Sequence, residues 1–547
     1  MLLPFISSLA SAETFDTDLI YFILVDRFAD GIAVDEQQSF LDPSDIAAFH
    51  GGDLYGIINR ADHLEKMGVD AIWLSPIFEM RHEKFMGHGA IHGYWLHSMD
   101  RIEPFFGGEE ALQKLSSDLE QREWKLILDM VYNHVSFDSP FLEIHPDWFH
   151  ESKPIEDWND PYQLTHHTVH GLPDLDQSRE VVYRYLYHRS IHWQNQTKAA
   201  GFRIDAIRHM ENDFLKRLST DLHQELGNSF WLLGEDFNGS PSALASRVNE
   251  TGIDSLFDFP LYYAMTDTFC RDQSMFGLAA TLWSDRDYPK EHQPVRFLDN
   301  HDLPRIASLC EENRLQEALF FLFTVRGIPM LTYGTEFGLS GAEEPENRES
   351  IDWKESPKWL PLISDLSALR SKHPVLKQGA PQIVHVDDQV LLYAQRHGSK
   401  FALVGINHSQ KTYSVPFSNP DASYRIRDQR LQKNAPLNLE PEDISVWIWN
   451  EAPISAPKLK NYTIKVHSKS EHPLFLIGSS SVIGGWNPQH ALPFNQTNEG
   501  WELELELPSD ATLLWKTLQK NGTELIWEQG DNHILWSDPI LAIELSK

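Results

Sequence analysis

The chain of 547 residues has few cysteines and little positive charge, and both shortages exclude classes of protein. Cys270 and Cys310 are its two cysteines, too few for a disulfide framework and without the spacing of metal ligands. They could form one bridge or stay reduced, and we expect buried thiols. Lys and Arg number 46 against 80 Asp and Glu, which gives a formal net charge of −34. We therefore expect neither nucleic acid nor an anionic membrane as a partner, because phosphates need basic patches.

Long apolar runs are also missing, and none has the length of a membrane-spanning helix. The first dozen residues are apolar and end in the small-x-small pattern Ala10-Ser11-Ala12, although no basic residue precedes them. We expect residues 1–13 to be a signal or leader segment, and the protein to be secreted or periplasmic.

Four short segments carry acidic residues or histidine at the ends of strand-like runs. They are residues 129–134, 201–209, 233–236 and 297–302. In three of them an apolar run leads into the charged residues, and in the second the apolar residues alternate with Arg203 and Asp205. Buried parallel strands deliver polar groups at their C-terminal ends in this way. Four such ends indicate one site at the mouth of a (β/α)₈ barrel.

The segment between residues 19 and 372 alternates short apolar runs with amphipathic stretches, which predicts an α/β fold with a parallel sheet. The predicted strands are 19–28, 71–74, 125–130, 202–204, 230–233, 256–259, 295–298 and 329–331, with helices such as 56–67, 179–198 and 314–323 between them. Eight strands predict closure into a barrel.

Beyond Pro374 the pattern changes to short alternating runs, which predicts β-sandwiches. A Pro-containing segment at 451–457 is typical of a linker. We predict a barrel formed by residues 14–134 and 176–373, an inserted domain at 135–175, one β-sandwich at 374–451 and another at 458–547.

The four segments, in their order along the chain and in their residues, resemble those of glycoside hydrolase family 13, the α-amylase family. The last unit resembles the family 20 starch-binding module, through Leu-Ile-Gly at 476–478, Gly-Gly-Trp-Asn-Pro at 484–488, Trp501 and Ile-Trp-Glu-Gln-Gly-Asp-Asn at 526–532. The resemblance implies a TIM barrel with an inserted domain B, an all-β domain C and a β-sandwich carbohydrate-binding module.

Cleavage of a glycosidic bond with retention needs a nucleophilic carboxylate and a carboxylic acid about 5–5.5 Å apart. The resemblance assigns the nucleophile to Asp205, the general acid/base to Glu235 and the third carboxylate to Asp302. Arg203 shares a strand face with Asp205 and can keep that carboxylate ionised. Crowding by other carboxylates would raise the pKa of Glu235, as an acid near neutral pH requires.

The same resemblance implies a set of sugar contacts around these carboxylates. They are His92, Tyr94, His134, Arg203, Arg208, His209, His301 and Arg348. Arg208 stands where α-amylases more often have Lys, and Glu344 stands where relatives usually have Asp, so we expect altered subsite preference and an unchanged reaction.

Calcium is the cofactor that the resemblance implies, with Asn133, Asp174 and the carbonyl of His209 as ligands. Oxygen ligands of these kinds suit a hard cation, although Asn133 and Asp174 could instead hydrogen-bond the domain B loop. In the C-terminal module the implied starch site comprises Trp486, Lys516, Trp527, Glu528 and Asn532, with His533 where relatives commonly have Arg.

These residues predict a monomeric, retaining, endo-acting α-amylase that hydrolyses α-1,4-glucosidic bonds in starch, glycogen and maltooligosaccharides. A maltogenic amylase or 4-α-glucanotransferase is the alternative, because a sugar can capture the same covalent intermediate. Cyclodextrin-forming relatives usually have another β-domain before the starch-binding module, and its absence here favours hydrolysis. A non-catalytic glucan-binding protein is disfavoured, since all three carboxylates are present.

Overall fold

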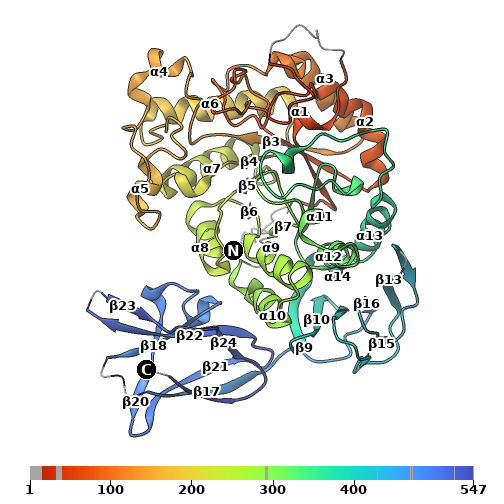
Figure 1. Cartoon of the computed structure of the whole chain (residues 1–547), viewed down its shortest axis with the longest axis vertical. Coiled ribbons are helices and arrows are strands. Elements are labelled where there is room, and N and C mark those ends of the chain that lie inside the picture. The colour runs from red at the N-terminus through yellow and green to blue at the C-terminus, as the bar shows by residue number, and fades with distance from the viewer. Residues whose placement is uncertain are drawn as a thin grey trace, which may run out of the picture.

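The computed structural model describes residues 15–32, 40–289, 293–427, 429–468, 470, 472–522 and 524–545, so the predicted leader at 1–13 lies outside it. Figure 1 shows a large helical unit, coloured red through green, above two strand-rich units in teal and blue. Among the described residues, no helix combines the length and the apolar character needed to cross a membrane.

Eight parallel strands form the predicted barrel. They are β1 (Ile20–Ile23), β2 (Ala71–Leu74), β3 (Lys125–Met130), β4 (Gly201–Ile204), β5 (Trp231–Gly234), β6 (Ser255–Leu256), β7 (Val295–Phe297) and β8 (Ile328–Thr332). Their order is β6-β5-β4-β3-β2-β1-β8-β7. A parallel bridge from Phe257 to Val295 joins the two ends of this sheet. Nearly every strand residue is buried, because barrel strands are covered on both faces.

Two predicted strands are shorter than the apolar runs suggested. The run 19–28 ends as a strand at Ile23 and continues as the short helix α1 (Val25–Phe28), where the carboxylate of Asp26 accepts the backbone N–H groups of His50 and Gly51. In the run 256–259, Asp258 accepts the N–H of Leu261 and thereby starts helix α9. An acidic side chain that satisfies backbone donors turns the chain at both places.

Helices alternate with the strands, and those predicted at 56–67, 179–198 and 314–323 are confirmed within two residues at each end. The longer ones are α2 (Leu54–Lys66), α3 (Gly108–Gln121), α6 (Glu180–Thr197), α7 (Asn212–Leu226), α8 (Pro241–Thr251), α9 (Phe259–Met265), α10 (Met275–Trp283), α12 (Glu312–Thr324) and α13 (Leu360–Lys372). Helix α8 begins where Ser240 accepts the N–H of Ala243, with Pro241 at its first position.

The long connection between β3 and α6 forms the inserted domain. It contains the short helices α4 (Phe141–Ile144) and α5 (Pro161–His166), and bridges from His134 to Asp174 and from Phe149 to Leu175 close it. These bridges hold the insertion at the mouth of the barrel.

Two all-β units follow, as predicted. The first has the sheet β14-β13-β16-β11-β10-β9 and the pair β12-β15. Its strands are β9 (Ala380–Val386), β10 (Val390–His397), β11 (Lys400–Asn407), β12 (Tyr413–Ser414), β13 (Ala422–Arg427), β14 (Arg430–Lys433), β15 (Asn438–Leu439) and β16 (Asp443–Trp449).

The second unit has the sheets β20-β21-β17-β25 and β19-β18-β22-β23, with β24 paired to β22. Its strands are β17 (Leu459–His467), β18 (Leu474–Gly478), β19 (Leu492–Pro493), β20 (Asn495–Thr497), β21 (Gly500–Pro508), β22 (Leu513–Asn521), β23 (Glu524–Trp527), β24 (His533–Leu535) and β25 (Ile540–Glu544).

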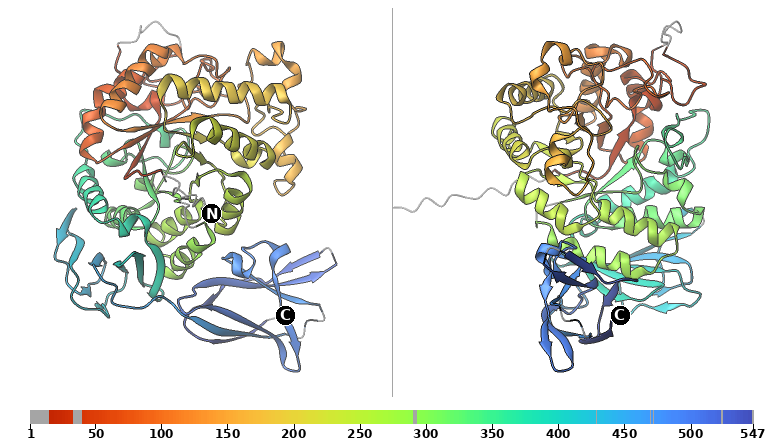
Figure 2. Two further views of the ribbon diagram at one scale, coloured as in Figure 1. Left: turned by 180° about the vertical axis from the view of Figure 1, so that it is seen from behind. Right: turned by 60° about the vertical axis from the view of Figure 1, so that its left-hand side comes forward.

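This C-terminal unit is docked against the barrel helices (Figure 2). The carboxylate of Asp287 accepts hydrogen bonds from the hydroxyls of Ser480 and Ser481 and from the N–H of Ser481, at 2.7 to 3.1 Å. Arg286 pairs with the buried Asp510 at 3.0 Å. These polar contacts hold the unit directly on the barrel.

The two cysteines form a disulfide, so the prediction of buried thiols is wrong. Cys270 ends the π-helical turn after α9, and Cys310 follows the short helix α11 (Ile306–Leu309). They are 40 residues apart in sequence, and their Cα atoms lie 4.2 Å apart. The packing of distant elements brings the two cysteines together, and no local sequence pattern predicts this disulfide.

Candidate active site

Three carboxylates meet around the guanidinium group of Arg203, whose side chain is fully buried. Its Nη1 lies 2.6 Å from Asp205 Oδ1 and 3.0 Å from Asp129 Oδ1, and its Nη2 lies 2.5 Å from Glu235 Oε1. The three carboxylates come from the ends of β3, β4 and β5, which are neighbours in the sheet. One cation therefore fixes the positions of the predicted nucleophile and the predicted acid.

The pKa values in this cluster follow from burial and charge. Burial raises the pKa of Glu235 to about 8, Arg203 opposes this rise, and Asp205 and Asp302 add to it. The direction agrees with the sequence prediction, but burial, rather than crowding, is the larger cause. Burial also raises the pKa of Asp129 to about 7. Burial lowers the pKa of Arg203, yet Asp129 and Glu235 reverse the effect and raise it well above its ordinary value.

Asp302 lies in the loop after β7 and is the most exposed of the predicted carboxylates, with 36% of its side chain accessible. Its Oδ1 lies 3.0 Å from Arg348 Nη2, and its Oδ2 lies 3.1 Å from His301 Nε2. Burial of its carboxyl raises the pKa of Asp302. His301 and Arg348 lower the pKa by more than this, so the net shift is downward. Asp302 is therefore an anion that can accept sugar hydroxyls.

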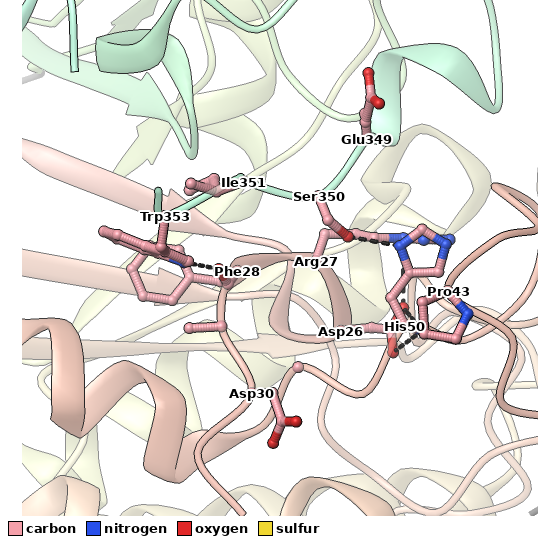
Figure 3. Close-up of a pocket in the computed structure, with 12 residues that line it drawn as sticks. Asp26, Arg27, Phe28, Asp30, Pro43, His50, Glu349, Ser350, Ile351 and Trp353 are labelled. Carbon is pink, nitrogen blue, oxygen red and sulfur yellow. Dashed lines mark hydrogen bonds and ion pairs between the residues drawn. The ribbon is translucent and has the colours of Figure 1, made fainter. Parts of the chain in front are cut away.

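Hydrogen bonds and ion pairs within the protein fix the position of the Arg348 side chain. Its Nε donates to the carbonyl of His301 at 2.8 Å, and Nη1 pairs with Glu344. Two residues further on, the Ser350 hydroxyl lies 2.6 Å from His50 Nδ1, across the pocket drawn in Figure 3. This bond ties the loop after β8 to the loop after β1.

The predicted sugar contacts His92, His134 and His301 all contact Tyr94. The Tyr94 ring stacks on His301 at 5.1 Å between ring centroids, and its hydroxyl donates to Asp129 Oδ2 at 2.8 Å. His92 accepts the N–H of Tyr94, and His134 contacts the Tyr94 carbonyl. Burial lowers the pKa of all three histidines, so each is a neutral hydrogen-bonding group.

Arg208 and His209 lie on the other side of Glu235, in the loop after β4. Arg208 Nη1 donates to the Phe237 carbonyl at 3.4 Å, and His209 Nδ1 contacts the Leu164 carbonyl at 2.9 Å. The Phe237 ring is 38% exposed beside them. An exposed ring next to an acid suits the apolar face of a sugar.

Asp129 is a site residue that the sequence interpretation missed. Although it opens one of the four charged segments, no role was assigned to it. It is buried and accepts hydrogen bonds from Trp73, Tyr94 and Arg203. The signal that could have identified it is its position near the C-terminal end of β3, where the other charged segments also place their polar residues.

Two of the predicted metal ligands, Asn133 and Asp174, each have a side-chain oxygen without a donor. Asn133 Oδ1 and Asp174 Oδ1 are both buried and accept no hydrogen bond from any described residue. Asp174 Oδ2 lies 2.7 Å from His150 Nδ1. Within the described ranges, no three His, Cys, Asp or Glu side chains cluster as metal ligands. A cation here would therefore need amide and backbone carbonyl oxygens beside one carboxylate, which is a donor set that fits calcium.

In the C-terminal unit, the two tryptophans predicted as ring platforms of the starch site share one apolar patch. Trp486 and Trp527 are partly buried against the cluster of Ile477, Ala491 and Leu518. Glu528 accepts hydrogen bonds from Thr517, and its Oε1 lies 2.6 Å from His533 Nε2. Lys516 Nζ donates to the Gly530 carbonyl at 2.5 Å, and Asn532 is exposed. Two of the predicted starch residues, Trp486 and Trp527, thus share one patch.

Comparison with known families gives two matches. The model described as the catalytic domain of alpha amylase matches residues 22–372, which is more than half of the chain. The model described as a starch binding domain matches residues 461–537.

Individual relatives include both amylases and transferases. A cyclomaltodextrin glucanotransferase of Klebsiella oxytoca is 26% identical over 610 residues, covering 95% of this chain and 92% of that protein. The crystal structure of an α-amylase from Geobacillus thermoleovorans complexed with acarbose has a TM-score of 0.71 and 30% identity, over 80% of this chain and 99% of that one. A cyclomaltodextrin glucanotransferase with a three-domain ABC distribution has a TM-score of 0.71 and 29% identity, over 79% and 99%.

Proposed function

The chain belongs to the α-amylase family, and on that premise we propose that it is a retaining, endo-acting enzyme that hydrolyses α-1,4-glucosidic bonds in starch, glycogen and maltooligosaccharides. The observation that carries this proposal is the pairing of Asp205 and Glu235 with one buried guanidinium. Two carboxylates on one guanidinium suit the separation of about 5–5.5 Å that retention requires.

The proposed reaction has two steps. Asp205 attacks the anomeric carbon while Glu235 gives its proton to the leaving oxygen, which forms a glycosyl-aspartate ester and frees the shorter glucan. Glu235, now a carboxylate, takes a proton from water, and the resulting hydroxide cleaves the ester. Arg203 donates to Asp205 Oδ1 at 2.6 Å and so holds the nucleophile in place, and the raised pKa of Glu235 keeps its proton available near neutral pH.

A 4-α-glucanotransferase or maltogenic enzyme is the second candidate, in which a sugar replaces water in the second step. The exposed Phe237 ring beside Arg208 favours this candidate, since it can hold an acceptor sugar. The absence of another β-domain no longer argues against it, because a cyclomaltodextrin glucanotransferase with three domains is similar to this chain.

A time course on soluble starch, with products resolved by chromatography, separates the two candidates. We expect mixed short maltooligosaccharides, and a loss of activity in Glu235→Gln by about 10²–10⁴-fold, because the general acid is gone. Cyclic products, or products longer than the donor, would establish transfer instead. The exposed Glu120→Gln on α3 is the matched control, and full activity of Glu235→Gln would contradict the assignment of the acid.

We also propose that calcium binds Asn133 Oδ1, Asp174 Oδ1 and the carbonyl of His209. The two side-chain oxygens that accept no hydrogen bond support this proposal. These residues join the inserted domain to the barrel, and calcium would supply electrostatic cross-linking there, with no part in the bond cleavage.

Removal of calcium by a chelator should therefore lower the melting temperature. At a calcium concentration about 100 times Kd the ion stabilises the fold by about 2.7 kcal/mol. The variant Asn133→Ala should lose this response, whereas Asn159→Ala, at an exposed position of the inserted domain, should keep it. An identical melting temperature of the wild type with and without chelator would rule the site out.

We further propose that the protein acts as a monomer that is secreted or periplasmic. All the groups of the proposed site come from one chain, and the Cys270–Cys310 disulfide fits an oxidising compartment.

A further inference from the structure

The backbone that carries Arg348 is held by contacts of the next three residues. The Glu349 carbonyl accepts the hydroxyl of the tyrosine that follows β8 at 3.0 Å, and the N–H of Ile351 donates to a carbonyl of α1 at 3.2 Å. Between these two contacts, the Ser350 hydroxyl lies 2.6 Å from His50 Nδ1, as the dashed line in Figure 3 shows. The side chains of Ser350 and His50 therefore connect this segment to the loop after β1.

The loop that carries His50 is itself fixed by buried charged groups. The N–H of His50 donates to both carboxylate oxygens of Asp26 at 3.0 Å, and Asp26 is 1% exposed. The guanidinium group of Arg27, which is also buried, donates to the carbonyls of Ile46 and Ala48 at 2.8 Å. The imidazole of His50 thus reaches the segment after β8 from a loop whose backbone is held on both sides.

The surroundings of His50 determine which ring nitrogen carries the proton. Burial and the neighbouring Arg27 lower the pKa of His50 to about 4, so near neutral pH the ring is uncharged and has one N–H. Its Nε2 lies 3.2 Å from the carbonyl of Asp45, which can only accept, so the proton is on Nε2. Nδ1 is then an acceptor, and the Ser350 hydroxyl must donate to it. Two hydrogen bonds therefore run in series from Ser350 through the ring to Asp45.

The position of Arg348 in turn determines how Asp302 is held. Arg348 Nη2 lies 3.0 Å from Asp302 Oδ1, and its Nε donates to the carbonyl of His301 at 2.8 Å. A shift of the Arg348 backbone by about 1 Å would take such contacts out of hydrogen-bond range. Contacts that fix this backbone therefore also fix the guanidinium group beside Asp302.

We propose that His50 is a positioning residue of the reaction, which acts through Ser350 and Arg348 on the third carboxylate, Asp302. This role of His50 rests on the proposed function, because Asp302 takes part in a reaction only if a sugar is cleaved at this site. The imidazole acts through geometry. As the acceptor for Ser350, it keeps the segment after β8 closed on the loop after β1, and so keeps the guanidinium group within reach of Asp302.

Two amide substitutions separate the two hydrogen bonds of His50. Asn places its side-chain oxygen about where Nδ1 lies and can accept from Ser350, whereas Gln places its nitrogen about where Nε2 lies and keeps only the bond to Asp45. We expect kcat/KM on maltoheptaose to fall about five- to tenfold in His50→Gln and in Ser350→Ala, because one hydrogen bond that positions Arg348 is lost. His50→Asn, which restores the acceptor, should stay within about twofold of wild type.

A double-mutant cycle with Arg348 is the decisive measurement, because general damage to the fold would multiply with the loss of Arg348. In the Arg348→Ala background, His50→Gln should lower kcat/KM no further, since the group that His50 positions is gone. His188→Gln, at an exposed position of α6, is the matched control for the lost imidazole and should have no effect in either background. Independent losses in the cycle, equal losses in His50→Asn and His50→Gln, or full activity of Ser350→Ala would overturn the inference.

If the wild type cleaves no α-1,4-glucan, the proposed function fails instead. The same cycle is then measured as the Kd for maltoheptaose by calorimetry, where His50→Gln should weaken binding only when Arg348 is present. Absence of binding, or independent effects of the two substitutions on Kd, would overturn the role of His50.

Discussion

At the scale of single residues, Arg203 decides how the charged groups of the site coexist. Its guanidinium contacts Asp129, Asp205 and Glu235 and so offsets the repulsion between neighbouring carboxylates. Its contacts hold Asp205 at 2.6 Å, while burial raises the pKa of the neighbouring Glu235, so the two carboxyl groups have different environments. Different environments for two carboxyls are what an acid and a nucleophile need.

A prediction about pH follows from Glu235. Its folded pKa of about 8 lies above the ordinary value of 4.5, so its contribution to the free energy of unfolding is full below 4.5 and disappears as the pH rises to about 8. The melting temperature of Glu235→Gln should therefore rise relative to wild type across this window. Scanning calorimetry at several pH values measures the difference, and a constant difference would contradict the raised pKa.

Catalysis should have the same sign of pH dependence. Because the acid must carry its proton, kcat/KM should fall on the alkaline side as Glu235 ionises. Asp302, whose pKa is lowered by His301 and Arg348, is already ionised there and adds no alkaline limb.

At the scale of elements, the disulfide joins two segments that the barrel alone would not link covalently. Cys270 follows α9, Cys310 follows α11, and the closed loop spans 40 residues. In the chain-entropy model a loop of this length stabilises the fold by about 4 kcal/mol. The bridge lies away from the residues that contact Arg203, so it contributes to stability and takes no part in the chemistry.

Replacement of both cysteines by serine should lower the free energy of unfolding by up to about 4 kcal/mol. Urea unfolding followed by tryptophan fluorescence gives this quantity, and the activity at room temperature should stay near that of wild type. Reduction of the wild type should give the same loss. Equal stability of the double variant and wild type would show that the bridge does not constrain the unfolded chain.

At the scale of the whole molecule, the starch-binding unit is a docked part of the enzyme. The carbonyl of Gly485, next to the platform residue Trp486, accepts hydrogen bonds from Ser240 and Ser242 at the start of α8. A Cβ at Gly485 would collide with the Ser242 hydroxyl, so glycine is required for this close approach. Since Ser240 is five residues after Glu235, the starch patch lies near the rim that carries the site.

Asp287→Ala should weaken the docking of this unit, because the carboxylate that binds Ser480 and Ser481 is lost. We expect several-fold lower activity on granular starch, with activity on maltotetraose close to wild type. Small-angle X-ray scattering should show a larger radius of gyration. Glu506→Ala, at an exposed position of β21, removes the same charge outside the contact and is the control. An unchanged ratio of granular to soluble activity would mean that docking has no role in substrate capture.

The sequence by itself determined the barrel and named the candidate carboxylates. The barrel signal is local, because buried parallel strands need short apolar runs, whereas the roles of Asp205, Glu235 and Asp302 were predicted from the resemblance of four segments to a known family. The helices and the two β-units were equally predictable, since periodicity reports which face of an element is buried.

Only the tertiary structure decided how distant segments meet. The Arg203 contacts to Asp129 and Glu235, the disulfide and the docking through Gly485 all join residues far apart in sequence. The hydrogen bond between His50 and Ser350 is likewise visible only once the loops after β1 and β8 meet. Local sequence specifies which side chains point inward, whereas the partners of those side chains depend on the packing of the whole chain.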